Sequence, residues 1–200
     1  MEIKKEKVVI GRSFFARNSL EVARDILGHV LVRESPEGKT SGIIVEVEVY
    51  RGEDDPASFA FRGKTKRSEP LYGSPGTAFV YLTYGMYHLL NIITERENFP
   101  AAILIRAVEP SEGIDLMKKR RKTNNIYNLA SGPGKLTRAF GIDLSLNGID
   151  VTFPSSPLYI LNVKKIKSFE LVWRPRIGIR EGLDRLWRVY IKDNKFISKK

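Results

Sequence analysis

The sequence contains no cysteine, which excludes disulfide bonds, iron–sulfur clusters and zinc sites with cysteine ligands. Only two histidines, His29 and His88, are present, so a histidine-rich metal site is excluded as well. No apolar run reaches the roughly 18 residues of a membrane-spanning helix, so no such helix is predicted. The first residues, MEIKKEKVVIGRS, lack the apolar stretch and the cleavage site of a signal peptide. We therefore expect an intracellular, cytoplasmic protein.

Negative charge is also scarce, because 23 acidic residues face 34 lysines and arginines, which gives a formal net charge of +11. Such an excess favours a polyanionic partner, nucleic acid before an anionic membrane surface. The alternative is that the charge serves only non-specific adhesion or solubility. The chain has 200 residues, of which 42% are hydrophobic, enough to bury a core. We expect one domain over residues 1–200.

Helices are predicted from their start and stop signals. Asn18 is a suitable N-cap for one helix, and Gly28 suits its end. A second helix is expected to begin near Ser111, directly after Pro110 ends a strand, and to carry basic residues in its last turn. A third is predicted over residues 133–141, with a proline in the first turn and a glycine at the end.

Strand signals outnumber helix signals. Strands are predicted over residues 29–34, 41–50, 76–83, 87–94, 101–109 and 185–192. The first two read as a hairpin, and the next two read as a hairpin joined at Tyr84-Gly85-Met86. Because hairpins outnumber βαβ units, we predict an α+β fold: a single domain with a curved, mostly antiparallel sheet, surrounding helices and a protruding β-hairpin.

The strand SGIIVEVEVY alternates valine with other residues. Because strand side chains alternate between faces, Ile44, Glu46, Glu48 and Tyr50 are expected on one face and the valines on the core face. Glutamates on such a strand are most often exposed. For Glu46, both exposure and a structural role remain open.

Arg106 lies inside the apolar strand AAILIRAV. A buried guanidinium needs a carboxylate or a phosphate, so we predict that Arg106 pairs with Glu48 in a polar site between their strands. A glutamate paired with arginine keeps its charge at pH 7 and can act as a base towards water. The alternative is an ion pair with a structural role only.

Aromatic and basic residues are interleaved in the middle of the chain. Tyr84 sits beside Gly85 at the predicted hairpin tip, where it can hardly join the core but could enter a stacked duplex. The run RGKTKR, residues 62–67, suits phosphates and unstacked bases, although such a charge run alone is more often a solvated loop. Asn91, inside an apolar strand, must find hydrogen-bond partners, either by closing a turn or by facing a base edge.

Several of these stretches together resemble the alkyladenine (3-methyladenine) DNA glycosylase family of the human and Bacillus type. They are GIIVEVEVYRGEDDPASFAFRGKT, PGTAFVYLTYGMYHLLNI, AILIRAVEP, ASGPGKL and RPRIGI, in order within residues 14–191. The resemblance implies a monofunctional enzyme that flips damaged purines out of duplex DNA and hydrolyses the N-glycosidic bond, leaving an abasic site. It also implies no metal, no redox cofactor and no Schiff-base lysine.

The resemblance carries roles onto matching residues. Glu48 matches the general base, Arg106 matches the arginine that helps to hold the water, and Ile177 matches the position whose carbonyl completes the water site. Tyr50 and Tyr81 match the aromatics that sandwich the base.

Further positions match the DNA-facing side of the site. Tyr84 matches the tyrosine that fills the gap left by the flipped nucleotide, and Asn91 matches the asparagine that obstructs the 2-amino group of guanine. Further DNA contacts are predicted for Met86, Tyr87, Arg62, Lys64, Lys66 and Arg67.

One pocket position departs from the family. Phe59 stands where the family usually has a histidine, so the ring surface is kept but the imidazole is lost. The departure concerns the range of damaged bases accepted more than hydrolysis itself, because Glu48 and Arg106 are both present.

The expected partner is double-stranded DNA containing damaged purines, with no membrane partner and a monomer as the expected form. The expected location is the cytoplasm, at the nucleoid in a prokaryote, or the nucleus in a eukaryote. The main alternative is a non-catalytic nucleic-acid-binding domain that uses the same aromatic and basic residues.

Overall fold

The structure, a computed structural model, describes residues 8–163 and 169–199. Its helices are α1 (Arg12–Phe15), α2 (Ser19–Ile26), α3 (Ile114–Arg121) and α4 (Pro133–Phe140), with short 3-10 turns η1 (Phe59–Arg62), η2 (Glu69–Tyr72), η3 (Ile126–Asn128) and η4 (Leu144–Leu146). Its strands are β1 (Val30–Ser35), β2 (Gly38–Arg51), β3 (Ala78–Thr83), β4 (Tyr87–Ile93), β5 (Ala101–Glu112), β6 (Leu158–Leu161), β7 (Leu171–Arg174) and β8 (Arg188–Ile191).

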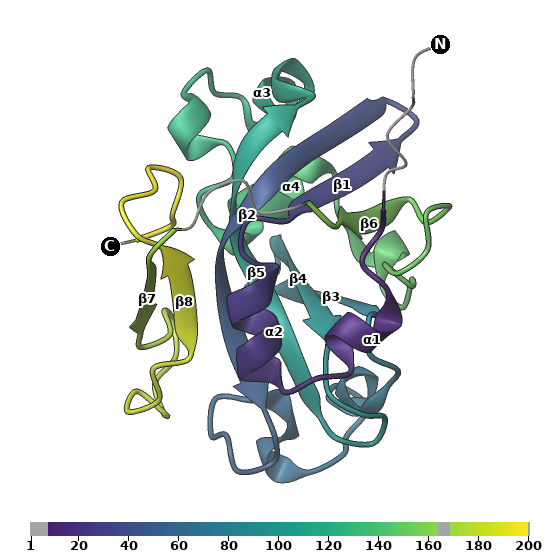
Figure 1. Cartoon of the computed structure of the whole chain (residues 1–200), viewed down its shortest axis with the longest axis vertical. Coiled ribbons are helices and arrows are strands. Elements are labelled where there is room, and N and C mark those ends of the chain that lie inside the picture. Colours follow the sequence, from purple (N-terminus) through teal and green to yellow (C-terminus); the bar gives the residue numbers. More distant parts are fainter. Residues whose placement is uncertain (1–7, 164–168, 200) are drawn as a thin grey trace.

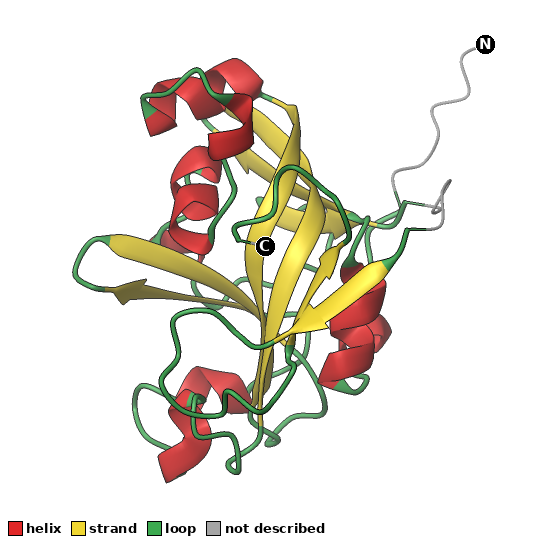
Figure 2. Ribbon diagram, turned by 90° about the vertical axis from the view of Figure 1, so that its left-hand side faces the viewer, coloured by secondary structure: helices red, strands yellow, loops and turns green. Residues whose placement is uncertain are grey.

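The strands form one curved sheet in the order β3-β4-β5-β2-β1-β6, and β8 pairs with β2 and β7. Every pairing between these strands is antiparallel, which confirms the predicted α+β class. Figure 1 shows the long β2 at the centre, and Figure 2 shows helices on both sides of the sheet. One edge of β2 pairs with β5, while the other is divided between β1 and β8. This division places β8 beside the second half of β2.

The pairing of β2 with β5 is irregular where the polar residues lie. The register passes over Val45 on β2 and Arg106 on β5, as expected for β-bulges. Ile44 therefore joins Val47 and Val49 in the main core, whereas the buried Val45 lies outside it. The strict alternation predicted for this strand is wrong at its start, because an extra residue reverses the order of the two faces.

The predicted boundary between β5 and α3 is also wrong. β5 runs through Pro110 to Glu112, and α3 begins at Ile114 instead of near Ser111. Proline is tolerated there because the register of β2 and β5 shifts beside it, so its missing N–H breaks no regular ladder. Gly113 makes the turn with a φ of 72°, and a Cβ there would lie 2.2 Å from the Lys39 carbonyl oxygen.

The other end signals are confirmed. The Asn18 side chain accepts a hydrogen bond from the Leu20 N–H at the start of α2. α4 begins at Pro133 and ends at Phe140, and Gly141 caps this end in the left-handed conformation. The predicted turn at residues 84–86 joins β3 to β4. Local capping and turn chemistry therefore fixed these ends.

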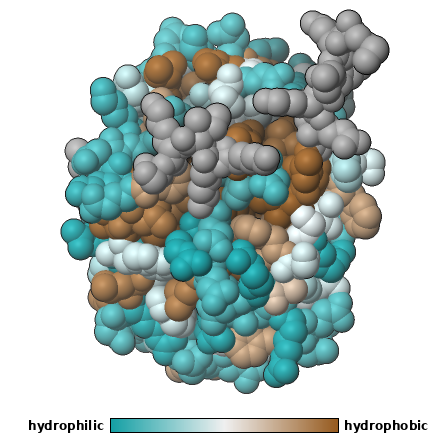
Figure 3. Space-filling view, in the orientation of Figure 1, coloured by the Kyte–Doolittle hydropathy of each residue, from teal (hydrophilic) through white to brown (hydrophobic). Residues whose placement is uncertain are grey.

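Two apolar clusters fill the interior. The larger packs α2, α3 and α4 against the sheet. The smaller contains Ala60, Leu71, Phe79, Ile93 and Ala102, with Phe59, Tyr72 and Tyr81 against it. Figure 3 shows the face that carries α2, where hydrophilic residues predominate and hydrophobic residues form separate patches.

None of the helices within residues 8–163 and 169–199 is long and apolar enough to cross a membrane.

Candidate active site

A pocket of about 520 Å³ opens beside the β3–β4 hairpin, a volume typical of small-molecule sites. Its lining comes from β2, η1, η2, β3, β4, β5, the start of α4 and adjoining loops, among them the loop before β8. Predicted residues among the lining are Tyr50, Phe59, Arg67, Tyr81, Tyr84, Tyr87, Asn91, Arg106 and Ile177. The described part of the chain brings together no group of three or more histidine, aspartate or glutamate residues that could hold a metal ion.

Glu48 is fully buried and is not part of the pocket lining, but it accepts three hydrogen bonds from residues that are. Its Oε2 accepts from Arg106 Nη1 at 3.1 Å and from the Tyr50 hydroxyl at 3.0 Å. Its Oε1 accepts from the Ile177 N–H at 2.7 Å. The predicted pairing of Glu48 with Arg106 is therefore confirmed. The Ile177 N–H, which the sequence did not suggest, fixes the other carboxylate oxygen.

The charge state of Glu48 is set by opposing effects. Burial raises the pKa of Glu48 above its ordinary value of 4.5, while Arg106, the Ile177 N–H and the Tyr50 hydroxyl lower it. The neighbouring Glu46 charge adds to the raising effect, and the pKa remains raised overall. Arg106 acts in the expected direction, but the desolvation of a carboxylate in this interior outweighs it.

Glu46 is also fully buried. Of the two roles that the sequence left open for it, the exposed one is therefore wrong. Its Oε1 accepts from Arg106 Nε at 3.3 Å and from Arg188 Nη1 at 3.0 Å. The Ser198 N–H donates to its Oε2 at 2.6 Å, and the Ser198 hydroxyl donates to its Oε1 at 2.8 Å. Because β8 lies beside β2, Glu46 acquires partners that are remote in sequence.

Sequence reasoning missed Arg188, although a signal existed. Arg188 stands in the apolar stretch LWRVYI, and the argument for a buried guanidinium applied to it as well as to Arg106.

A second missed ion pair supports the pocket from behind. Arg176 binds Asp55 through Nη1 at 2.6 Å and Nη2 at 2.7 Å, and both side chains are fully buried. Arg176 Nη1 also donates to the Val49 carbonyl at 2.9 Å. Its guanidinium carbon lies 4.7 Å from the centre of the Tyr50 ring. The pair therefore fixes Tyr50 and the backbone next to Ile177.

Aromatic rings form another part of the pocket wall. Phe59 meets Tyr81 edge-on with ring centres 4.9 Å apart, and Phe79 lies 5.2 Å from Tyr81. Arg67 stacks over Phe59, with its guanidinium carbon 4.2 Å from the ring centre. Burial raises the pKa of Tyr81 to about 12, so its hydroxyl stays protonated at neutral pH. The wall thus offers flat apolar surface beside a cation.

Asn91 is buried and lines the pocket, with its amide nitrogen donating to the Phe79 carbonyl at 3.3 Å. This bond joins β4 to β3 and orients the amide, which confirms that the buried asparagine has a hydrogen-bond partner; its contact with a base edge stays a prediction.

The tip of the hairpin is highly exposed. Tyr84 is 82% exposed, Met86 67% and Tyr87 47%. Tyr84 has a φ of 51°, a left-handed conformation that costs a non-glycine residue about 1–2 kcal/mol. Tyr84 and Tyr87 line the pocket, whereas Met86 lies outside its lining. A strained, exposed tyrosine beside a pocket is better explained by a role in contacting a ligand than by a role in stabilising the fold.

The basic run is divided by the structure. Arg67 lines the pocket, whereas Arg62, Lys64 and Lys66 lie outside its lining on the exposed surface. Lys64 lies 3.6 Å from Glu69, a contact on the protein surface. Within the described part of the chain, Arg67 is therefore the one residue of this run that lines the pocket.

Comparisons with known proteins agree over nearly the whole chain. The family model described as Methylpurine-DNA glycosylase (MPG) matches residues 13–195. A relative from Clostridium perfringens is 47% identical, over 96% of this chain and 99% of its own. Relatives from Prosthecochloris aestuarii and Methanocella arvoryzae are each 46% identical, covering 94% and 96% of this chain and 90% and 96% of their own. All three are provisionally named 3-methyladenine DNA glycosylase.

Proposed function

Because the chain belongs to the methylpurine-DNA glycosylase family, we propose that its pocket receives a damaged purine flipped out of duplex DNA, and that Glu48 activates the attacking water. The family makes the protein a DNA glycosylase, an enzyme of DNA repair that acts on alkylation damage. The observation that carries the proposal is Glu48, a buried carboxylate held by three donors beside a pocket with aromatic walls.

The hydrogen bonds of Glu48 indicate which of its oxygens receives the proton. Each carboxylate oxygen can accept about two hydrogen bonds. Oε2 accepts from Arg106 and Tyr50, whereas Oε1 accepts from the Ile177 N–H and keeps capacity for one more donor. The proposed water donates to Oε1, loses a proton to it, and forms a bond to the sugar C1′. The purine leaves with the electrons of the broken C–N bond, and the sugar remains as an abasic site.

The pocket walls suit the flipped base. Tyr50 is covered by Arg176, which holds the ring in place. Phe59 and Tyr81 supply further aromatic surface. Stacking on an aromatic side chain is worth about 1–3 kcal/mol per base and offsets part of the unstacking cost. In this proposal, the walls hold the base while Glu48 acts at the sugar.

The direct test is release of free base from a duplex with one 7-methylguanine or 3-methyladenine, measured together with abasic-site formation. The undamaged duplex of the same sequence is the control. Release of the damaged base alone supports the proposal. Binding of the damaged duplex without release would favour the alternative, a non-catalytic nucleic-acid-binding domain.

The pH dependence of release should reflect the raised pKa of Glu48. A base must be ionised, so the rate should rise with pH through that pKa, with a midpoint above 4.5. Single-turnover rates on a 7-methylguanine duplex measure this rise of the rate with pH, because that base is already cationic and its departure needs no added proton. A midpoint at or below 4.5 would contradict the raised pKa.

Tyr84→Ala should weaken the flipped complex for every lesion. The exposed ring is proposed to fill the gap in the duplex, and flipping costs a few kcal/mol that a damaged pair only partly reduces. The loss should be greatest for lesions in well-stacked pairs. Fluorescence of 2-aminopurine beside the lesion reports the flipped population. Phe153→Ala, which removes an exposed ring outside the pocket lining, serves as control. Equal losses in both variants would remove Tyr84 from this role.

Phe59→His should change the order of preference among lesions. The phenylalanine ring makes T-shaped contacts with Tyr81 and Phe79 and lies under Arg67, whereas histidine adds polar nitrogens inside the pocket. The measurement is release from a panel of 3-methyladenine, 7-methylguanine, hypoxanthine and ethenoadenine duplexes. A uniform fall for all four would mean that Phe59 supports the fold and does not contact the base.

A further inference from the structure

Ser198 reaches the ion pairs beneath the pocket from the segment that follows β8. Its N–H and hydroxyl both donate to Glu46, and its hydroxyl oxygen accepts from Arg106 Nη2 at 3.3 Å. The adjoining Lys199 carbonyl accepts from Arg188 Nη1 at 2.8 Å. Ser198 is absent from the pocket lining, so these contacts lie behind the site.

The guanidinium of Arg106 is consequently held on three sides. Its Nε binds Glu46, its Nη1 binds Glu48 and its Nη2 binds Ser198. A planar guanidinium fixed at three nitrogens cannot turn about its last side-chain bond without breaking a contact. The direction of Nη1 towards Glu48 therefore depends on partners that do not touch Glu48 themselves.

We infer that Glu46 and Ser198 are positioning residues for hydrolysis, which hold Arg106 so that it fixes Glu48 Oε2. This inference rests on the proposed function and extends it to two residues that lie outside the pocket lining. The carboxylate of Glu46 reaches Arg106 and Arg188 together, and Ser198 supplies both a donor and an acceptor at this junction. A misplacement of about 1 Å in a catalytic group can lower the rate by about 10²-fold.

Ser198→Ala is the main test, since it removes the hydroxyl but neither the N–H nor any charge. We expect single-turnover base release to fall by about 10-fold, typical of one lost hydrogen bond to a charged group. Binding of the lesion duplex should stay within about 2-fold, because the change lies behind the pocket. Ser198→Thr, which keeps a hydroxyl, should restore the rate. Ser145→Ala, at an exposed serine on η4, is the control.

The pH profile separates positioning from simple support of the fold. Glu48 is faced by Arg106, Tyr50, the Ile177 N–H and Glu46, and Arg106 lowers its pKa. Loosening Arg106 weakens that effect, so the acid midpoint of release should move to higher pH in Ser198→Ala. A structural role alone would lower the amount of folded protein and leave the midpoint unchanged.

Glu46→Asp provides a second measurement. It keeps the negative charge but shortens the reach to Arg106 Nε, so release should fall by about 10²-fold in the folded protein. If this variant fails to fold, the Ser198 series still decides the question. A wild-type rate and midpoint in Ser198→Ala would overturn the inference. Absence of release by the wild-type protein would instead overturn the proposed function.

Discussion

Glu48→Gln should bind a lesion duplex as the wild-type protein does and release the base about 10²–10⁴-fold more slowly, the usual contribution of a positioned general base. Glutamine has almost the same shape but cannot take a proton from water at neutral pH. Ile177 and Arg106 donate to opposite oxygens of Glu48. In either orientation of the glutamine side chain, its amide nitrogen would therefore face one of these donors. The measurement combines single-turnover release with the dissociation constant for the same duplex.

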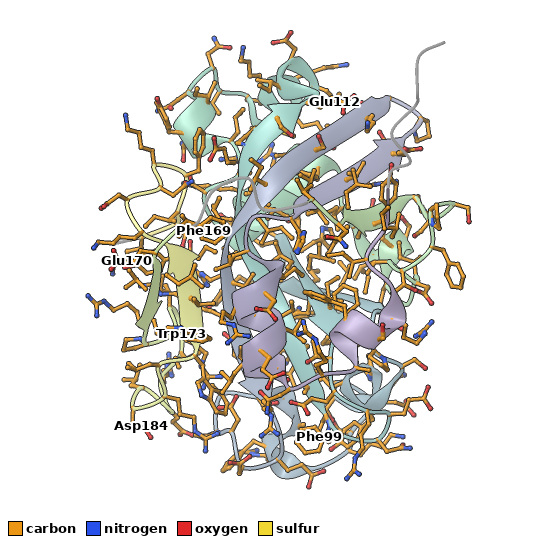
Figure 4. All side chains as sticks on the ribbon, in the orientation of Figure 1. Phe99, Glu112, Phe169, Glu170, Trp173 and Asp184 are labelled. Atoms are coloured by element: carbon orange, nitrogen blue, oxygen red, sulfur yellow. The ribbon has the colours of Figure 1, made fainter. Side chains whose placement is uncertain are left out.

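A matched control is Glu112→Gln. Glu112 lies at the α3 end of β5, where Figure 4 labels it, and more than half of its side chain is exposed. This variant should release base at the wild-type rate. If Glu48→Gln bound tightly and kept near-full release, Glu48 would have no part in activating the water.

Arg106→Ala should lower the free energy of unfolding by about 3–5 kcal/mol, because two buried carboxylates lose a partner. Glu46 would retain Arg188 and Ser198, but Glu48 would lose its only guanidinium contact among the described residues. Base release should fall as well, since Oε2 of Glu48 would no longer be fixed. Denaturant unfolding measures the first effect, and release by the folded protein measures the second.

Arg24→Ala is the control for an arginine with a carboxylate neighbour. Arg24 contacts Asp25 on the surface with its side chain 57% exposed, and such solvent-screened pairs contribute little to stability. An Arg106→Ala protein as stable as this control would show that the buried carboxylates adjust without their cation. The pairing of Arg106 with Glu48 would then carry little energy.

The sequence by itself determined the features that depend on neighbouring residues. Asn18, Pro133 and Gly141 fixed helix ends because capping and left-handed turns are decided within a few residues. The pairing of Glu48 with Arg106 was also predictable, although the two residues lie on different strands. A guanidinium in an apolar strand requires an anion, and the adjoining strand of the sheet offered one.

Only the tertiary structure decided how the other polar groups join that pair. The bulges at Val45 and Arg106 depend on how β2 and β5 fit together, so a constant two-residue period could not place them. Glu46 is buried because Arg188 and Ser198 reach it from 142 and 152 residues away. Arg176 and Asp55 meet behind Tyr50 across 121 residues of chain. Desolvation and charge pairing act on distances in space, which local sequence patterns do not contain.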